Sequence, residues 1–172
     1  FSRLGLYGFC IFRNNFIRFF GRGFSRCRVS SLIFSFSAIV TTDDGDDTGD
    51  NRTVQGSLRQ FILNSNAIDN ASFGGGVEVR TSNFSIGGGG AQTIAIPDVL
   101  PDLTDTVILD GTTQEGWTGA PVIELNGTGT LATDSGLTLD ANNSVIRGLV
   151  INRFGDSGIT VKGDNNTVAG NY

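Results

Sequence analysis

The chain has 172 residues, with 12 basic and 17 acidic side chains, a net charge of −5, two cysteines and no histidine. The segment 1–42 contains six arginines and no acidic residue, so the remainder carries 6 minus 17, a net −11. This balance excludes nucleic-acid binding by charge for the acidic part, and the lack of histidine excludes histidine-based catalytic triads. Cys10 and Cys27 both lie in the basic part, which leaves the acidic part without disulfides or thiolate sites.

Residues 1–39 are expected to form a basic leader that is separate from the fold. Arg26 and Arg28 precede the uncharged stretch 29–40, a pattern typical of a secretory signal. That stretch is too short to cross a bilayer as a helix, so we expect no membrane span. The alternative is that the leader is translated from upstream of the true start. Because the chain lacks methionine and begins with phenylalanine, we expect it to be a piece of a longer product.

Residues 40–70 are predicted to contain an acidic linker and one helix. In the linker, Asp44, Asp46 and Thr48 match the first, third and fifth positions of a calcium loop. Gln55 stands at the twelfth position, where such a loop has a bidentate glutamate. Calcium is therefore one hypothesis for this segment, and a solvated acidic linker is the other.

The helix is predicted around residues 57–66. Ser57 is placed as its N-cap, with Gln60 three residues later as in a capping box. Leu58, Phe61 and Ile62 follow the i, i+3, i+4 spacing of one apolar face. A short helix with one apolar face predicts a cap that covers the exposed end of a sheet structure.

Residues 71–172 are predicted to be all-β, after glycine runs at 74–76 and 87–90 that we interpret as loops. Strands are expected at 93–96, 106–109 and 122–125. Their apolar residues alternate, which predicts one buried face. The expected inward pairs are Val107/Leu109, Ile123/Leu125, Leu137/Leu139, Leu149/Ile151 and Ile159/Val161. Turns that contain residues tolerant of positive φ are expected at Asp110-Gly111, Asn126-Gly127, Asn142-Asn143 and Gly155-Asp156.

The last part of the chain nearly repeats itself. The segment 135–140 recurs as 157–162, and the difference between 157 and 135 gives a period of 22. Asn142-Asn143 recurs as Asn165-Asn166 at a spacing of 23, which we interpret as the same period with one residue added in a turn. A constant period of short strands and turns predicts a parallel β-solenoid. An antiparallel sandwich is the rival fold, because asparagine-glycine pairs also mark hairpins.

Few side chains point to a ligand. Trp117, the single tryptophan, and Tyr172 are candidates for stacking on a sugar ring. The alternative is that they fold back over the edge of the structure. Asp140 and Lys162 occupy equivalent repeat positions and are expected to form a surface ion pair.

Several of these segments, taken in order, resemble bacterial secreted right-handed parallel β-helix proteins. The resemblance is carried by the segments 56–60, 108–114, 123–127 and 144–154, and it covers about residues 40–172. It implies a pectin-lyase-like β-helix in an exported or surface-anchored protein, of which this chain is the N-terminal portion. Further coils of the parent chain are then expected beyond Tyr172.

Two functions are expected from the residues and the resemblance together. The first is a non-catalytic secreted or cell-surface module with a structural or adhesive role that contacts polysaccharides or cell-surface glycans. The second is a polysaccharide lyase or glycoside hydrolase whose active site lies in coils outside this chain. We favour the first, because acidic and basic residues are sparse in the predicted coils.

Overall fold

A computed structural model describes residues 11–13, 16–18, 38–44, 56–67 and 79–172. The chain divides into two compact units, Phe1–Phe34 and Ser35–Tyr172. In the first unit, β1 (Ile11–Arg13) and β2 (Phe16–Arg18) pair as antiparallel strands. All other described elements belong to the second unit.

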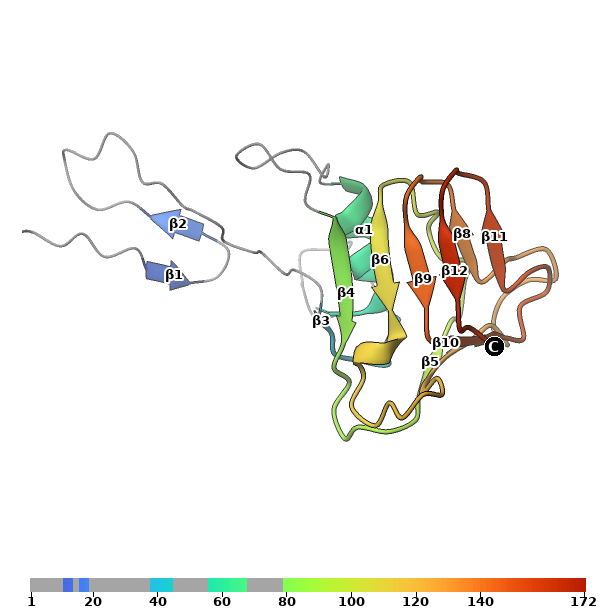
Figure 1. Cartoon of the computed structure of the whole chain (residues 1–172), viewed down its shortest axis with the longest axis horizontal. Coiled ribbons are helices and arrows are strands. Elements are labelled where there is room, and N and C mark those ends of the chain that lie inside the picture. Colours follow the sequence, from blue (N-terminus) through green and yellow to red (C-terminus); the bar gives the residue numbers. More distant parts are fainter. Residues whose placement is uncertain (1–10, 14–15, 19–37, 45–55, 68–78) are drawn as a thin grey trace, which may run out of the picture. The chain divides into compact units, whose positions relative to one another are not determined.

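The described strands of the second unit form three parallel sheets, accompanied by one α-helix (Figure 1). The five-stranded sheet has the order β12-β9-β6-β4-β3, the three-stranded sheet β10-β7-β5, and the two-stranded sheet β11-β8. The elements are β3 (Ala38–Ile39), α1 (Leu58–Ala67), β4 (Arg80–Phe84), β5 (Gln92–Ala95), β6 (Val107–Asp110), the 3-10 helix η1 (Gly111–Thr113), β7 (Ile123–Asn126), β8 (Leu137–Leu139), β9 (Val145–Arg147), β10 (Leu149–Asn152), β11 (Ile159–Val161) and β12 (Thr167–Ala169).

Every strand pair between residues 38 and 172 that the structure describes is parallel. The prediction of parallel strands with one helix is therefore confirmed, and the antiparallel sandwich is wrong for this unit. Asparagine-glycine was a misleading signal, because Asn126-Gly127 ends a parallel strand and does not close a hairpin.

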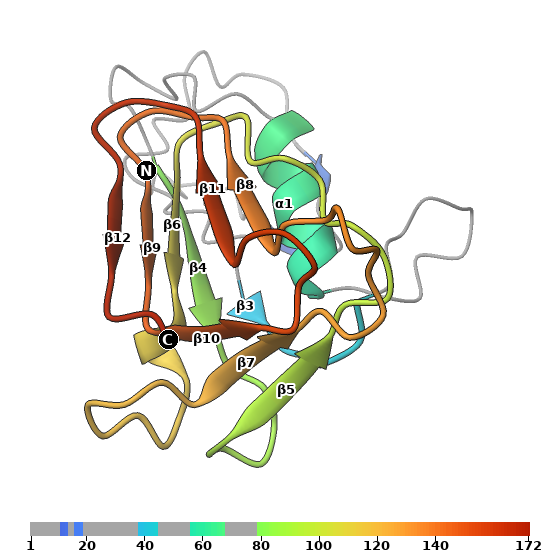
Figure 2. The ribbon, with the colours of Figure 1, turned by 90° about the vertical axis from the view of Figure 1, so that its right-hand side faces the viewer.

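The chain visits the three sheets in a fixed order. β4 lies in the five-stranded sheet and β5 in the three-stranded sheet, and Leu103 then bridges to Leu139 of the two-stranded sheet. β6, β7 and β8 repeat this order, β9, β10 and β11 repeat it again, and β12 begins a further passage. We call one such passage a round. Figure 2 shows β12, β9, β6 and β4 in succession on one side of the unit, with β11 and β8 on another.

The last rounds keep one constant period. Ile159 pairs with Leu137 and Thr167 pairs with Val145, and both pairs differ by 22 in residue number. The alignment of Asn142-Asn143 with Asn165-Asn166 is therefore wrong by one position. Asn143 and Asn165, at φ 55° and 56°, are the equivalent pair, and Ser144 is the counterpart of Asn166. The left-handed conformation that asparagine tolerates is what repeats.

Glycine marks a second corner of each late round. Gly148, with φ of 72°, is the single residue between β9 of the five-stranded sheet and β10 of the three-stranded sheet, and Gly170, with φ of 60°, follows β12 at the equivalent place. In the round before them, the equivalent place holds residues 111–122. Gly111 does not have positive φ. A side chain there would overlap the Gly148 carbonyl oxygen and lie 2.7 Å from Leu149 Cδ2, so close packing explains this glycine.

Inward-pointing aliphatic side chains form one core. Four of the five predicted inward pairs are buried, the exception being Ile159/Val161, where Ile159 is half-buried and Val161 is 47% exposed. The buried members are Val107, Leu109, Ile123, Leu125, Leu137, Leu139, Leu149 and Ile151. Ile39 of β3 also belongs to this core, so the fold extends N-terminal of residue 40, where we expected the leader to end.

The helix α1 forms as predicted, with Leu58, Phe61 and Ile62 buried in the core. The Ser57 hydroxyl accepts a hydrogen bond from the Gln60 amide at 3.0 Å, which confirms the N-cap. Asn66 joins the helix to the segment that precedes β6, because its side chain donates to the Asp102 carbonyl at 2.7 Å and accepts from the Thr104 amide at 3.0 Å.

Candidate functional site

The outer face of the three-stranded sheet carries a row of side chains in register. Along β7, Ile123 and Leu125 point into the core, so Glu124 between them points outward. Glu124 pairs with Thr93 of β5 on one side and with Val150 of β10 on the other. Tyr172 continues this row, since its amide donates to the Leu149 carbonyl at 2.9 Å and its carbonyl accepts from the Ile151 amide at 2.8 Å.

The Glu124 carboxylate is fixed by three neighbouring polar groups. Its Oε2 accepts from the Thr93 hydroxyl at 2.7 Å, and its Oε1 accepts from Asn152 Nδ2 at 2.9 Å and from Arg153 Nη1 at 3.4 Å. The hydrogen bonds from Thr93 and Asn152, helped by the Arg153 charge, lower the pKa of Glu124, with desolvation as a weaker opposing effect. Glu124 is therefore an oriented, ionised acceptor on an open face.

Arg153 occupies this face in a strained conformation. Its φ is 60°, in the left-handed region that a non-glycine residue adopts at a cost of about 1–2 kcal/mol. The conformation turns the chain out of β10 and leaves the Arg153 side chain 60% exposed beside Glu124. Strain of this kind concentrates at sites with a role beyond packing.

The two predicted aromatic residues have different environments. Tyr172 is 76% exposed at the end of the Glu124 row. Trp117 is half-buried in the segment 111–122, and a Cβ on Gly148 would lie 3.3 Å from its Cζ3 atom. Trp117 thus folds against the following round, as the structural alternative anticipated, and Tyr172 offers the open ring.

An ion pair lies beside Trp117 at the same corner. Arg147 Nη2 and Asp110 Oδ2 are 2.5 Å apart, and Asp110 Oδ1 accepts from the Thr112 amide at 3.0 Å and from its hydroxyl at 2.6 Å. Burial raises the pKa of Asp110, but the hydrogen bonds from Arg147 and Thr112 outweigh it, so the net pKa is lowered. The hydrogen bond to Asp110 raises the pKa of Arg147.

The predicted calcium residues fall only partly within the described chain. Asp46 and Thr48 lie outside the described residues, so calcium stays a prediction. Asp44 is described, and its Oδ2 accepts from Arg59 Nη2 at 2.7 Å and from Nε at 3.0 Å. Burial raises the pKa of Asp44, with Arg59 opposing the shift. Asp44 is therefore already paired with the partly buried Arg59 guanidinium.

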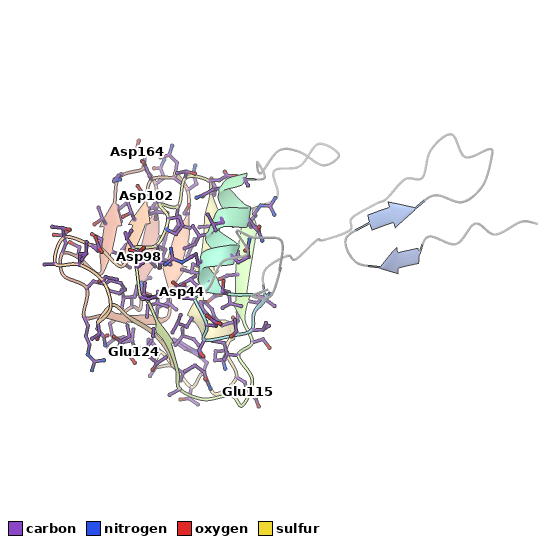
Figure 3. All side chains as sticks on the ribbon, turned by 180° about the vertical axis from the view of Figure 1, so that it is seen from behind. Asp44, Asp98, Asp102, Glu115, Glu124 and Asp164 are labelled. Carbon is purple, nitrogen blue, oxygen red and sulfur yellow. The ribbon has the colours of Figure 1, made fainter. Side chains whose placement is uncertain are left out.

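No cluster of three metal-binding side chains occurs in the part of the chain that the structure describes. Figure 3 shows that the labelled acidic side chains, among them Asp44, Glu115 and Glu124, are spread over the molecule. Within the described ranges, no helix is both long and apolar enough to cross a membrane.

The expected pair between Asp140 and Lys162 is wrong in detail. Lys162 follows β11 as Asp140 follows β8, so the two positions do stack. The Lys162 ammonium, however, donates to Asp102 Oδ2 at 2.9 Å. The hydrogen bond to Asp102 raises the pKa of Lys162, and the Asp140 charge adds to the shift.

Sequence reasoning missed Glu124, Asn152 and Arg153. A usable signal existed for Glu124, because it is the only charged residue among the middle positions of the five predicted inward pairs. Its partners were hidden, since they come from strands on either side of β7. Comparison of the chain with protein-family models, with curated proteins and with solved structures found no match in any of the three.

Proposed function

We propose that residues 38–172 are the N-terminal portion of a right-handed parallel β-helix in a secreted or cell-surface protein. We propose further that this portion is a non-catalytic module that contacts polysaccharide through the outer face of β5, β7 and β10. The fold proposal is supported by the fixed order in which the chain visits three parallel sheets and by the constant period of the last rounds. In it, α1 is the terminal cap and further coils of the parent chain follow Tyr172.

The single observation that carries the contact surface is the Glu124 row. It places an ionised carboxylate, an amide and a guanidinium on the same sheet face as an exposed tyrosine, with Val150 between Glu124 and Tyr172. Sugar hydroxyls need oriented acceptors and donors, and the apolar face of a sugar ring stacks on an aromatic side chain. A continuous sheet face that extends along the stacking direction suits a linear polymer.

At the proposed contact face, the charge state of Glu124 supports binding over proton transfer. The pKa of Glu124 and the pKa of Asp110 are both lowered, whereas a general acid requires a carboxyl pKa raised toward the working pH. The pKa of Lys162 is raised, which keeps its ammonium charged and unsuited to act as a base. The ionised Glu124 carboxylate can therefore contact a glycan by charge and hydrogen bonds.

The experiment is binding of the full chain to a panel of neutral and acidic polysaccharides, with product analysis for reducing or unsaturated ends. Retention of one polymer without cleavage is the expected result. Glu124→Gln should weaken binding by at least about tenfold, because a charge-assisted hydrogen bond contributes roughly 1.5–3 kcal/mol and a factor of ten is about 1.4 kcal/mol. Tyr172→Ala should weaken it by a similar factor through lost stacking.

The matched control is Glu115→Gln, which removes an exposed carboxylate from the loop of residues 111–122 (Figure 3). It should leave binding unchanged. Equal losses in Glu124→Gln and Glu115→Gln would place the contact elsewhere on the acidic surface. Release of cleaved ends by the full chain would overturn the non-catalytic assignment.

A further inference from the structure

The last strands leave core positions uncovered. Val161 pairs with Leu139 and Val168 pairs with Ile146, and both partners are fully buried. Val161 and Val168 are nevertheless 47% and 45% exposed. We call this surface, formed by Ile159, Val161, Val168 and the backbone edge next to them, the open end.

Asparagine side chains connect the last round to the one before it. Asn166 Oδ1 accepts from the Ser144 amide at 2.7 Å, and its Nδ2 donates to the Ala141 carbonyl at 2.7 Å. Asn171 does the same five residues later, accepting from the Leu149 amide at 3.0 Å and donating to the Ile146 carbonyl at 3.0 Å. Each amide therefore satisfies one backbone donor and one backbone acceptor of the preceding round.

One round earlier, a serine occupies the position that corresponds to Asn166. It makes one hydrogen bond to the backbone of the preceding round, where Asn166 makes two. Ser144, the counterpart of Asn166, accepts from the Val107 amide at 3.1 Å. A hydroxyl oxygen reaches the donor alone, whereas the carboxamide of asparagine reaches donor and acceptor together. In two successive rounds, therefore, the side chain at this position accepts a hydrogen bond from the equivalent backbone amide of the preceding round.

The open end repeats the backbone groups that these asparagines bind. Displaced by one round, they are the Asn166 and Asn171 amides and the Gly163 and Val168 carbonyls. Among the described residues, none of these four groups makes a hydrogen bond to a side chain. The equivalent groups one round earlier face the following round, so these face the open end.

We propose that the open end is a docking surface for a strand–turn–strand segment that runs parallel to β11 and β12 and carries two asparagines five residues apart. The chemistry of that segment is the chemistry of this chain's own last round. In this segment, two apolar side chains with one residue between them cover Ile159 and Val161. A third apolar side chain, two residues after the first asparagine, covers Val168. This proposal rests on the stacking of rounds in the proposed fold and is independent of glycan contact.

The test appends a copy of residues 151–172 after Tyr172. Because Tyr172 pairs with Val150, a copy that starts with Ile151 continues the register. Amide hydrogen exchange is then measured on the full chain and on the extended chain. We expect exchange of the Asn166 and Asn171 amides to slow by at least about a hundredfold in the extended chain. The control is the same extension with the copies of Asn166 and Asn171 replaced by alanine, which should restore fast exchange.

Three outcomes overturn the proposal in different ways. Protection by the alanine extension as strong as that by the asparagine extension would show that the side-chain amides do not select the segment. Fast exchange in both extensions would show that nothing docks. In the chain without extension, the Ser144 and Leu149 amides should already be protected. Fast exchange of those two amides would show that the last two rounds do not stack, and the docking proposal would then be wrong as well.

Discussion

Ile62→Ala tests how α1 is held, because Ile62 has no solvent-exposed surface. The substitution removes three carbon atoms, which is about 2.4 kcal/mol of transfer free energy at about 0.8 kcal/mol per methylene. The residual cavity raises the loss, within the usual range of about 2–5 kcal/mol, and the better helix propensity of alanine returns about 0.4 kcal/mol. We expect the free energy of unfolding to fall by about 3 kcal/mol, a shift of the urea midpoint of about 1.5 M at a slope of about 2 kcal/mol/M.

Leu63→Ala provides the matched control on the same helix. Leu63 is the next residue and is half-buried, so the same kind of truncation should lower the free energy of unfolding by about 1 kcal/mol or less. Urea unfolding followed by circular dichroism compares the two variants. A loss at Leu63 equal to or greater than that at Ile62 would refute the assigned buried face of α1.

Gly111→Ala should lower the melting temperature through overpacking worth about 1–3 kcal/mol, whereas Gly87→Ala, with no atom within 4 Å of the added Cβ, should leave it nearly unchanged. Arg59→Met should lower the free energy of unfolding by about 3–5 kcal/mol, because it strands Asp44, whose side chain is 1% exposed. Adding Asp44→Asn to it should recover part of that loss, and a double-mutant cycle with no coupling would contradict the pairing. The lowered pKa of Asp110 adds stability above its ordinary pKa of 3.8 that disappears as pH falls through the folded-state value, so Asp110→Asn should flatten the acid limb of a stability–pH curve; an unchanged slope would refute the shift.

The helix and the strand positions could be predicted because their signals are local. Ser57, Leu58 and Phe61 lie within one helical turn of each other, and the structure buries the predicted face. Alternation along β6, β7 and β8 likewise needs only neighbouring residues. The stacking of parallel strands could be predicted only from spacing, and the period was visible in the two rounds whose connections have equal length.

The one-position error in the asparagine repeat has a physical cause. Matching letters aligns Asn142-Asn143 with Asn165-Asn166, but backbone conformation aligns Asn143 with Asn165. Asn166 then falls opposite Ser144, and the two share a role as acceptors for an amide of the preceding round. Serine and asparagine are different letters with one chemical function here, which identity matching does not detect.

Earlier rounds concealed the period because one corner changes length. The partners Ile108 and Val145 differ by 37 in residue number, whereas the partners Val145 and Thr167 differ by 22. Much of the difference lies in residues 111–122, the segment that contains Trp117 and replaces a single glycine. An insertion at a corner leaves the strands in register and destroys the sequence period.

The candidate site escaped prediction for a related reason. The row of Thr93, Glu124, Val150 and Tyr172 draws one residue from each of four rounds, and its residue numbers rise in unequal steps of 31, 26 and 22. No continuous stretch of the sequence contains this row. Its chemistry depends on neighbouring strands together, because side chains from both strands that flank β7 orient Glu124. In a chain whose rounds differ in length, a binding face is therefore defined by strand register, and residues at its centre carry no motif. The same register explains why the open end can specify a partner, because the Asn166 and Asn171 amides and the Gly163 and Val168 carbonyls each have a counterpart one round earlier that binds an asparagine side chain.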